Sequence, residues 1–410
     1  MPNMWKHEEV KPRMKGGVRS ELTLVCLEVK NERGKRMRRN LKVIPLMVLM
    51  VTLLAGSVVG AQTIKFGLVA PFTGSGSILG DYIQEAFMLA VDEINAEGGI
   101  EGKKIEVVVY DDEASPATAI NVVKRVIEND KVDVVFGPNM SSSVLAVHQV
   151  AQENETLMMV GATSPSLGYD NLANPWLFRL RADDRVRVEN QAEYAVNVLG
   201  SKKPGIIYGT TDYCTSARDV IIHKFAEYGI EPVAVEQMRE GDKDATGQIL
   251  NMVRAGVDSI MGLTHESEAA VFVRQLRQMG VNVPVVGFTA WGVPAFTDLA
   301  PEAATGVIAV QSFTPEDTNP VVQEFVEKYQ ARYGRLPSDP GQAYYDGVYV
   351  IKEVIERVGF DKQAMREELE NFSGFVGLQG ELVTDEKHNL SRFSLISEFQ
   401  GDGWKIIEKY

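Results

Sequence analysis

The sequence predicts an α/β protein with two lobes, each containing a parallel sheet covered by helices on both faces. Three observations support this fold class. From residue 64 onward, short β-branched runs alternate with longer stretches of helical periodicity. The alternation restarts after Arg181, which suggests a second lobe of similar build. At 410 residues, the chain also exceeds the size that one hydrophobic core usually serves.

The first series of alternating elements covers residues 64–160. Its clearest helix lies at 78–97, where Ala86, Leu89 and Ile94 recur at helical spacing before a Gly-Gly pair. Strands are expected at 64–70, 105–110, 132–136 and 157–160, and further helices at 117–129 and 141–153. Strands that alternate with helices in this way form parallel sheets.

The second series follows Arg181 and has the same rhythm. Helices are expected at 185–199, 216–228, 245–255 and 266–279, and strands at 204–208, 232–236, 257–262 and 283–287. After a strand at 305–311, the pattern changes to helices at 321–333 and 342–358. The stretches 381–384, 392–398 and 404–407 are typical of antiparallel strands, with a Gly-Asp-Gly turn at 401–403.

The first 61 residues form a separate, leader-like segment. Four basic residues between 36 and 42 precede an apolar run at 43–55, and small residues end at Ala61. This order is typical of a secretory signal, with a start at Met37 and cleavage after Ala61. A membrane anchor is the alternative, but the run is shorter than the about 20 residues that span a bilayer. Ser57 stands where a lipid-anchored protein would need cysteine, so we expect a soluble protein released into the periplasm or the medium.

The charge and the cysteine content exclude several classes of partner and cross-link. The whole chain has a net charge of −14, and removal of residues 1–61, with 12 Lys and Arg against 5 Asp and Glu, leaves −21. Such acidity disfavours binding to nucleic acid and to anionic lipid. Cys26 and Cys214 are the two cysteines, so the exported part would retain one thiol and no internal disulfide.

Six motifs together resemble type I periplasmic binding proteins, and in particular their Leu/Ile/Val-binding branch. The motifs are KFGLVAPFTG at 65–74, AVDEINAEGGIEGK at 90–103, the aspartate pair at 111–112, FGPNMSSS at 136–143, ATSPSL at 162–167 and QAYYDG at 342–347. The resemblance covers essentially all of residues 63–410.

The resemblance implies two doubly wound lobes joined by a hinge of three chain crossings. Lobe one would comprise residues 62–181 with 313–375, and lobe two residues 182–312 with 376–410. A protein of this family binds a branched-chain-like amino acid or a related small carboxylate between its lobes and delivers it to the membrane permease of an ABC importer. We therefore expect a monomeric binding protein with no cofactor and no enzymatic activity.

The serine run at 141–143 is the first candidate ligand contact. It follows a strand and a Gly-Pro turn at the expected start of a helix, where free backbone N–H groups favour an anion. The resemblance implies that Ser141 binds a ligand carboxylate, with Met140 beside it in the site. The alternative is that one of the serines only caps the helix.

Ala162 and Thr163 follow the next predicted strand, at the edge where open α/β sheets bind ligands. By resemblance, the Thr163 hydroxyl would hydrogen-bond the ligand carboxylate, and the Ala162 backbone would face it. A hydrogen bond to a charged group contributes about 1.5–3 kcal/mol, so two hydroxyls can set the orientation of a ligand. A capped turn is again the alternative.

The resemblance also assigns side chains that would cover the ligand. Tyr213 and His265 match aromatic positions of the family, and Leu79 matches a side chain over the mouth of the site. Cys214 stands where the family usually has glycine, which puts the orientation of Tyr213 in doubt. His265 fits an ordinary loop histidine equally well.

The loop at 288–294 departs from the family pattern. Thr289 and Trp291 are expected to face the cleft, because their loop ends a predicted strand. Branched-chain amino-acid binders carry an acidic residue near Thr289 that neutralises the ligand ammonium, and this loop has none. A buried ammonium without a counter-charge is costly. Either Glu266, Glu268 or another acid replaces it, or the ligand lacks an amine.

The sequence contains no convincing enzyme motif. The loop at 74–80 has GxGxxxG spacing rather than the dinucleotide-binding GxGxxG, and the acidic run at 111–113 fits a solvated strand end. The histidines lack metal-ligand spacing, and no serine lies in a GxSxG turn, so we expect no metal site. Three rival functions remain: a sensory module for a chemoreceptor or kinase, a binder of amine-free aromatic or aliphatic carboxylates, and an exported enzyme on the same scaffold.

Overall fold

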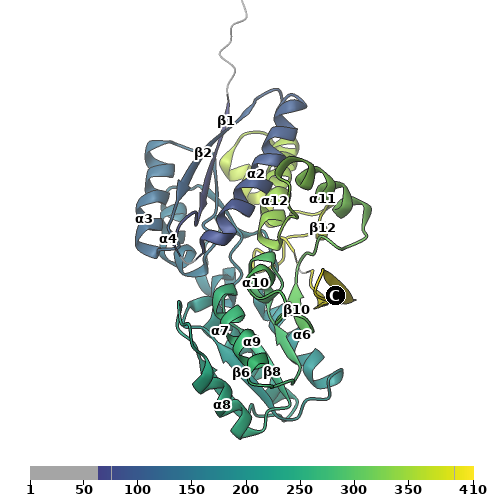
Figure 1. The fold of residues 1–410 in the computed structure, drawn as a ribbon. Coiled ribbons are helices and arrows are strands. Elements are labelled where there is room, and N and C mark those ends of the chain that lie inside the picture. The colour runs from purple at the N-terminus through teal and green to yellow at the C-terminus, as the bar shows by residue number, and fades with distance from the viewer. Residues whose placement is uncertain (1–62, 75, 392) are drawn as a thin grey trace, which may run out of the picture. The chain divides into compact units, whose positions relative to one another are not determined.

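The computed structural model describes residues 63–410, with the exceptions of Ser75 and Arg392. The predicted signal sequence and its cleavage site lie outside the described residues. Within the described part, two main sheets are covered by helices, as the sequence predicts (Figure 1).

The first sheet contains five parallel strands in the order β2-β1-β3-β4-β5. They are β1 (Ile64–Ala70), β2 (Ile105–Asp111), β3 (Val134–Phe136), β4 (Leu157–Val160) and β5 (Leu177–Arg179). The chain runs from β1 outward to β2 and then returns to β3 on the other side of β1. The strand order therefore reverses between β1 and β3, and such a switch point opens a crevice at the carboxyl ends of the strands.

Helices cover both faces of the first sheet (Figure 1). On one face, α2 (Ser77–Ala96), α11 (Pro320–Tyr333) and α12 (Asp339–Val358) share an apolar core with the sheet. On the other face, the core is formed with α3 (Pro116–Lys124) and α4 (Ser141–Glu153). Along β1, Phe66 and Leu68 belong to the first core and Val69 to the second, as the alternation of side chains in a strand requires.

The second sheet contains seven strands in the order β14-β13-β10-β9-β8-β6-β7. Its parallel strands are β6 (Pro204–Tyr208), β7 (Ala234–Gln237), β8 (Ser259–Leu263), β9 (Val285–Gly287) and β10 (Val307–Gln311). The antiparallel pair β13 (Leu395–Phe399) and β14 (Trp404–Lys409) extends the sheet beyond β10. Its core includes residues of α6 (Asp184–Asn197), α7 (Asp212–Glu227), α8 (Thr246–Ala255), α9 (Glu266–Gln278) and α10 (Pro294–Leu299).

Several short elements were not predicted from the sequence. They are α5 (Tyr169–Leu172), α13 (Lys362–Glu370), β11 (Phe375–Gly377) and two 3-10 turns at Pro165–Leu167 and Thr289–Trp291. Strand β11 forms an antiparallel hairpin with β12 (Gly380–Leu382), which overlaps the strand predicted at 381–384. A π-helical turn, Arg125–Asn129, continues α3. Strand β5 and helix α10 were missed as well, because elements of three to six residues carry little periodicity.

The start of α7 differs from the prediction in a way that matters for the site. The helix begins at Asp212 rather than at 216, so Tyr213 lies in its first turn. Its first turn, residues 212–215, mixes polar and apolar residues and shows no helical periodicity by itself. Asp212 is favourable there, since a carboxylate interacts well with the positive end of the helix dipole.

The chain passes between the two sheets three times, after β5, after β10 and before β13. The last passage lies later than the expected boundary at 375/376. Leu378, Leu382 and Leu390 are buried in the core of the first sheet, so residues 376–390 pack with lobe one and not with lobe two. The physical reason is the β11–β12 hairpin, whose Leu378 N–H donates to the buried Asp346 carboxylate of α12 at 3.0 Å.

Candidate functional site

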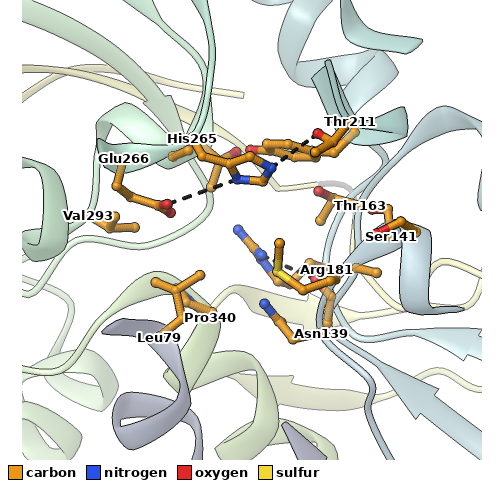
Figure 2. Close-up of a pocket in the computed structure, with 17 residues that line it drawn as sticks. Leu79, Asn139, Ser141, Thr163, Arg181, Thr211, His265, Glu266, Val293 and Pro340 are labelled. Atoms are coloured by element: carbon orange, nitrogen blue, oxygen red, sulfur yellow. Dashed lines mark hydrogen bonds and ion pairs between the residues drawn. The ribbon is translucent and has the colours of Figure 1, made fainter. Parts of the chain in front are cut away.

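A cavity lies at the carboxyl ends of the strands and receives residues from both lobes (Figure 2). Lobe one and the first crossing contribute Leu79, Asn139, Met140, Ser141, Ser142, Gly161, Ala162, Thr163, Arg181 and Pro340. Lobe two contributes Thr211, Tyr213, His265, Glu266, Thr289, Ala290 and Val293. The structure therefore brings together eight of the nine residues expected to contact a ligand: Leu79, Met140, Ser141, Ala162, Thr163, Tyr213, His265 and Thr289.

Trp291 is the exception, because its side chain does not line the cavity. The indole is fully buried in the core of the second sheet, in an edge contact with Phe272 at 6.3 Å between ring centroids. It occupies a slot left by two glycines on neighbouring strands. A Cβ at Gly262 would lie 2.4 Å from Trp291 Cζ2, and one at Gly287 would lie 2.2 Å from Trp291 Cβ. The expectation that Trp291 faces the cleft is therefore wrong.

Ser141 is the first residue of α4, and its side chain is buried at the cavity wall. Its Oγ accepts a hydrogen bond from the Ser164 N–H at 3.3 Å. The residue at the N-cap is Met140, and no side chain caps the helix. The alternative that a serine only caps α4 is therefore wrong. The first N–H groups of a helix have no partner within it, so an uncapped start at a cavity wall suits an anion.

The hydroxyl of Thr163 donates its hydrogen bond to a buried carboxylate. Thr163 Oγ1 donates to Asp184 Oδ2 at 2.6 Å, and Arg187 Nε donates to Asp184 Oδ1 at 3.0 Å. Burial raises the pKa of Asp184, while Arg187 and the Thr163 hydroxyl oppose that rise by stabilising the ionised form. Asp184 is the acceptor in both contacts, so the single Thr163 hydroxyl proton points at Asp184.

This polarity differs from the role expected for Thr163. A hydroxyl that has already donated its proton can offer only a lone pair to a ligand. Thr163 Oγ1 is thus suited to accept from a ligand N–H, and it is not suited to donate to a ligand carboxylate.

An aromatic wall comes from lobe two. The Tyr213 ring lies between His265 and Phe288, with centroid distances of 5.1 and 4.4 Å. His265 Nε2 lies 3.1 Å from Thr211 Oγ1, and burial lowers the pKa of His265 to about 4, so its ring is neutral near pH 7. Cys214 is fully buried and packs over Gly209 without disturbing the first turn of α7.

Glu266 is the acidic residue that lines the cavity. It opens α9, is 8% exposed, and lies opposite Ser141 and Thr163 (Figure 2). Burial raises its pKa to about 7, and its contact with a basic side chain is His265 Nδ1 at 4.0 Å. Of the two acids that the sequence suggested, Glu268 instead accepts from the Gly241 N–H at 2.7 Å.

Arg181 and Asn139 also line the cavity, and sequence reasoning missed both. Arg181 lies at the first chain crossing, where its Nη2 is 2.7 Å from Asp339 Oδ1 and its Nη1 donates to the Gly161 carbonyl at 3.1 Å. The available signal was a basic residue at the point where the alternation of strands and helices restarts. Asn139 was visible in the motif at 136–143 but was not separated from its serines.

Among the described residues, no group of three or more His, Cys, Asp or Glu side chains is arranged to hold a metal ion. None of the helices that they form combines the length and the apolarity needed for a membrane crossing.

Comparison with known proteins decides the family. A family model described as periplasmic binding protein matches residues 63–403. The chain belongs to the periplasmic binding protein family. This result confirms the family and the fold class predicted from the six motifs, and it agrees with a binding protein rather than an enzyme family.

Named relatives of this periplasmic binding protein extend the comparison. A leucine-, isoleucine-, valine-, threonine- and alanine-binding protein of Pseudomonas aeruginosa is 26% identical over 344 residues, which cover 81% of this chain and 88% of the relative. A Leu/Ile/Val-binding protein homologue of Brucella suis is 29% identical and covers 77% of this chain and 83% of the relative.

Solved structures of solute-binding proteins share the fold of this chain. The substrate-binding protein of a branched-chain amino acid transporter from Streptococcus pneumoniae, in complex with isoleucine, has a TM-score of 0.78 at 26% identity, covering 85% of this chain and all of that one. A solute-binding protein from Rhodopseudomonas palustris, in complex with 3,4-dihydroxybenzoic acid, has a TM-score of 0.78 at 21% identity and covers 85% of this chain and 97% of that one. The second match concerns the fold alone.

Proposed function

We propose that this periplasmic binding protein is the extracytoplasmic solute-binding subunit of an ABC importer and binds a small α-amino acid between its two lobes. The relatives named for branched-chain and other amino acids support an amino-acid ligand. The fold neighbour with dihydroxybenzoate keeps an amine-free carboxylate as the competing ligand class.

The observation that carries the choice of an amine is the hydrogen bond from Thr163 to Asp184. It leaves an acceptor in the cavity, and Glu266 adds an acid opposite it. A ligand with an ammonium group supplies donors to both. An aliphatic carboxylate without an amine would supply no donor at this position and would leave both acceptors unsatisfied.

The remaining contacts follow from the positions of the groups. Ser141 and the N–H groups at the start of α4 would hold the ligand carboxylate, with Ala162 beside them. Tyr213 and His265 would cover the ligand from lobe two, and Leu79 and Met140 would contact its apolar part. Thr289 would lie at the edge of the site.

Capture would occur by closure of the hinge. The two lobes, residues 63–181 with 313–390 and residues 182–312 with 393–410, supply opposite walls of the cavity. A ligand that contacts both walls stabilises the closed form over the open form, and the permease would recognise the closed form. We further propose that residues 1–61 direct export and are removed, and that the released protein is a soluble monomer that catalyses no reaction.

The test is a ligand screen followed by a paired comparison. Purified protein, freed of bound solute by unfolding and refolding, is screened with the twenty L-amino acids by thermal shift. A ligand at 100 times its Kd should add about 2.7 kcal/mol of stability. The tightest ligand is then compared with its deaminated analogue by calorimetry.

We expect the deaminated analogue to bind at least tenfold more weakly. T163V should weaken the amino acid by about 10- to 100-fold, and T163S should restore most of the affinity. Equal affinity for the two members of the pair would show that the amine is not recognised and would favour the carboxylate class. X-ray scattering with and without ligand checks the closure separately.

A further inference from the structure

The cavity contains a polar corner that the proposed contacts with the amino and carboxylate groups do not use. Arg181 and Asn139 lie next to one another there, on the side of the cavity away from His265 and Thr211 (Figure 2). The two residues are only 6% and 7% exposed. A guanidinium and an amide are strongly hydrated groups, so their burial at a cavity wall requires an explanation.

Each of these side chains has one buried polar atom that no described residue satisfies: Arg181 Nε and Asn139 Oδ1. The rest of the guanidinium is fixed by the Gly161 carbonyl at 3.1 Å and by Asp339 Oδ1 at 2.7 Å. The Arg181 Nε–H is therefore a positioned donor without an acceptor. Since an unpaired buried donor or acceptor is costly, this corner of a binding cavity suits polar ligand atoms.

The apolar residues near this corner cannot satisfy the two unpaired polar atoms. Leu79 and Pro340 lie beside it, and Val293 faces it from lobe two (Figure 2). An aliphatic ligand side chain would contact these three residues but would leave both polar atoms unsatisfied. A carboxylate or carboxamide group would accept from Arg181 Nε and from the amide nitrogen of Asn139, which points into the cavity (Figure 2).

We propose that Arg181 and Asn139 form a subsite for the ligand side chain, and that the preferred solute is an amino acid with a carboxamide or carboxylate side chain. The proposal rests on the proposed function, because it takes the α-amino and α-carboxylate groups to bind at Thr163, Glu266 and Ser141. A carboxamide or carboxylate side chain differs from the side chains of the amino acids in the relatives' names, and the proposal is argued from Arg181 and Asn139 of this chain.

Leucine, asparagine and aspartate provide the test, because they share one branched heavy-atom skeleton and differ in the polarity of its end. Their amine-free counterparts are 4-methylpentanoate, succinamate and succinate. All six are titrated calorimetrically into the unaltered, ligand-free protein. We expect asparagine or aspartate to bind at least tenfold more tightly than leucine, which is the size of one hydrogen bond to a charged group.

A variant then assigns the preference to Arg181. R181M/D339N removes both charges of the buried pair, so that neither is left alone, and thermal unfolding checks that the variant folds. The polar ligand should lose about 10- to 100-fold in affinity, and leucine should change by less than threefold. The comparison of ligands itself uses the unaltered chain and does not depend on the variant.

The outcomes separate the subsite from the amino-acid function. Leucine binding as tightly as asparagine and aspartate overturns the subsite and leaves amino-acid binding standing. Equal loss of all three ligands in R181M/D339N also overturns it, because Arg181 would then act on the shared α-carboxylate. If the amine-free compounds bind more tightly than the amino acids, the proposed function fails. The subsite is then still tested by comparing the affinities of succinamate and succinate with that of 4-methylpentanoate. No binding of any of the six by folded protein rejects both.

Discussion

Arg187 Nη2 lies 2.9 Å from Asp184 Oδ1, and neither side chain is exposed to solvent. The same guanidinium donates to the Ala182 carbonyl at 2.6 Å and to Ser312 Oγ. Ala182 belongs to the first chain crossing and Ser312 to the second. Arg187 therefore ties two crossings of the hinge to the carboxylate that orients the Thr163 hydroxyl.

Loss of the Arg187 guanidinium should destabilise the protein strongly. R187M leaves Asp184 as a buried charge without its cation, and breaking a buried pair in this way costs about 3–5 kcal/mol. Urea unfolding at pH 7 measures the change. The matched control is K352M, which removes a partly exposed pair with Glu356 and should cost less than about 1 kcal/mol. Similar stabilities of the two variants would contradict the prediction.

Glu266 should make the stability of the ligand-free protein depend on pH. Burial raises the pKa of Glu266 to about 7 from its ordinary value of 4.5. As pH rises, the unfolded chain therefore loses this proton before the folded chain does, and the group becomes destabilising between about pH 4.5 and 7. Relative to E266Q, the unaltered chain should lose on the order of 3 kcal/mol over this interval.

The measurement is the difference between the unfolding free energies of the two chains at pH 4.5, 6 and 7.5. Neighbouring groups do not mimic the effect. Burial lowers the pKa of His265 from 6.5 to about 4, so its contribution to stability rises with pH, has the opposite sign and is shared by both chains. The charges of Glu268 and Arg181 act on the Glu266 pKa in opposite directions. A difference that stays constant across the range would show that Glu266 is not protonated in the folded cavity.

Binding of an amine should depend on pH through the same carboxyl group. The ionised form of Glu266 pairs with an ammonium, so affinity should fall as pH drops below about 7, by at most about tenfold per pH unit. Titrations at pH 5, 6, 7 and 8 check this dependence. E266Q should bind more weakly and with little change over the range. An unaltered chain with constant affinity from pH 5 to 8 would remove Glu266 from amine recognition.

The slot for Trp291 should tolerate no side chain at Gly262. A Cβ there would lie 2.4 Å from Trp291 Cζ2, so G262A must displace the indole, and overpacking of this kind costs about 1–3 kcal/mol. The control is G247A, in α8, where an added Cβ meets nothing within 4 Å. Alanine favours a helix over glycine, so G247A should be neutral or slightly stabilising. Thermal unfolding compares the two.

Cys214 should be unreactive in the folded protein. It is fully buried, so a reagent cannot reach its sulfur. Burial also raises the pKa of Cys214 to about 12, so the reactive thiolate does not form near neutral pH. In a C26S chain, where Cys214 is the remaining cysteine, Ellman's reagent should label no thiol at pH 8 until denaturant is added. Rapid labelling of one thiol without denaturant would contradict the buried position of Cys214.

The cavity was largely predictable because its residues follow strand ends. Ser141, Thr163, His265 and Thr289 each lie just after a predicted strand or at the start of the following helix. In parallel sheets these ends share one edge, so sequence order places Ser141 near Thr163 on the first sheet and His265 near Thr289 on the second. Trp291 also follows a strand end but does not line the cavity, because its indole fits into the core in the space left by Gly262 and Gly287 on two neighbouring strands.

The fold class, the family and the two series of strands and helices could be predicted from the sequence, because periodicity and local motifs are properties of short stretches of chain. Three features became visible in the folded chain: Thr163 donates to Asp184, Glu266 rather than Glu268 lines the cavity, and Arg181 lies at the cavity wall paired with Asp339. These facts concern the direction of a proton, the burial of a charge and a contact between distant segments. Each depends on packing across the lobes and the crossings between them, which no local pattern in the chain encodes.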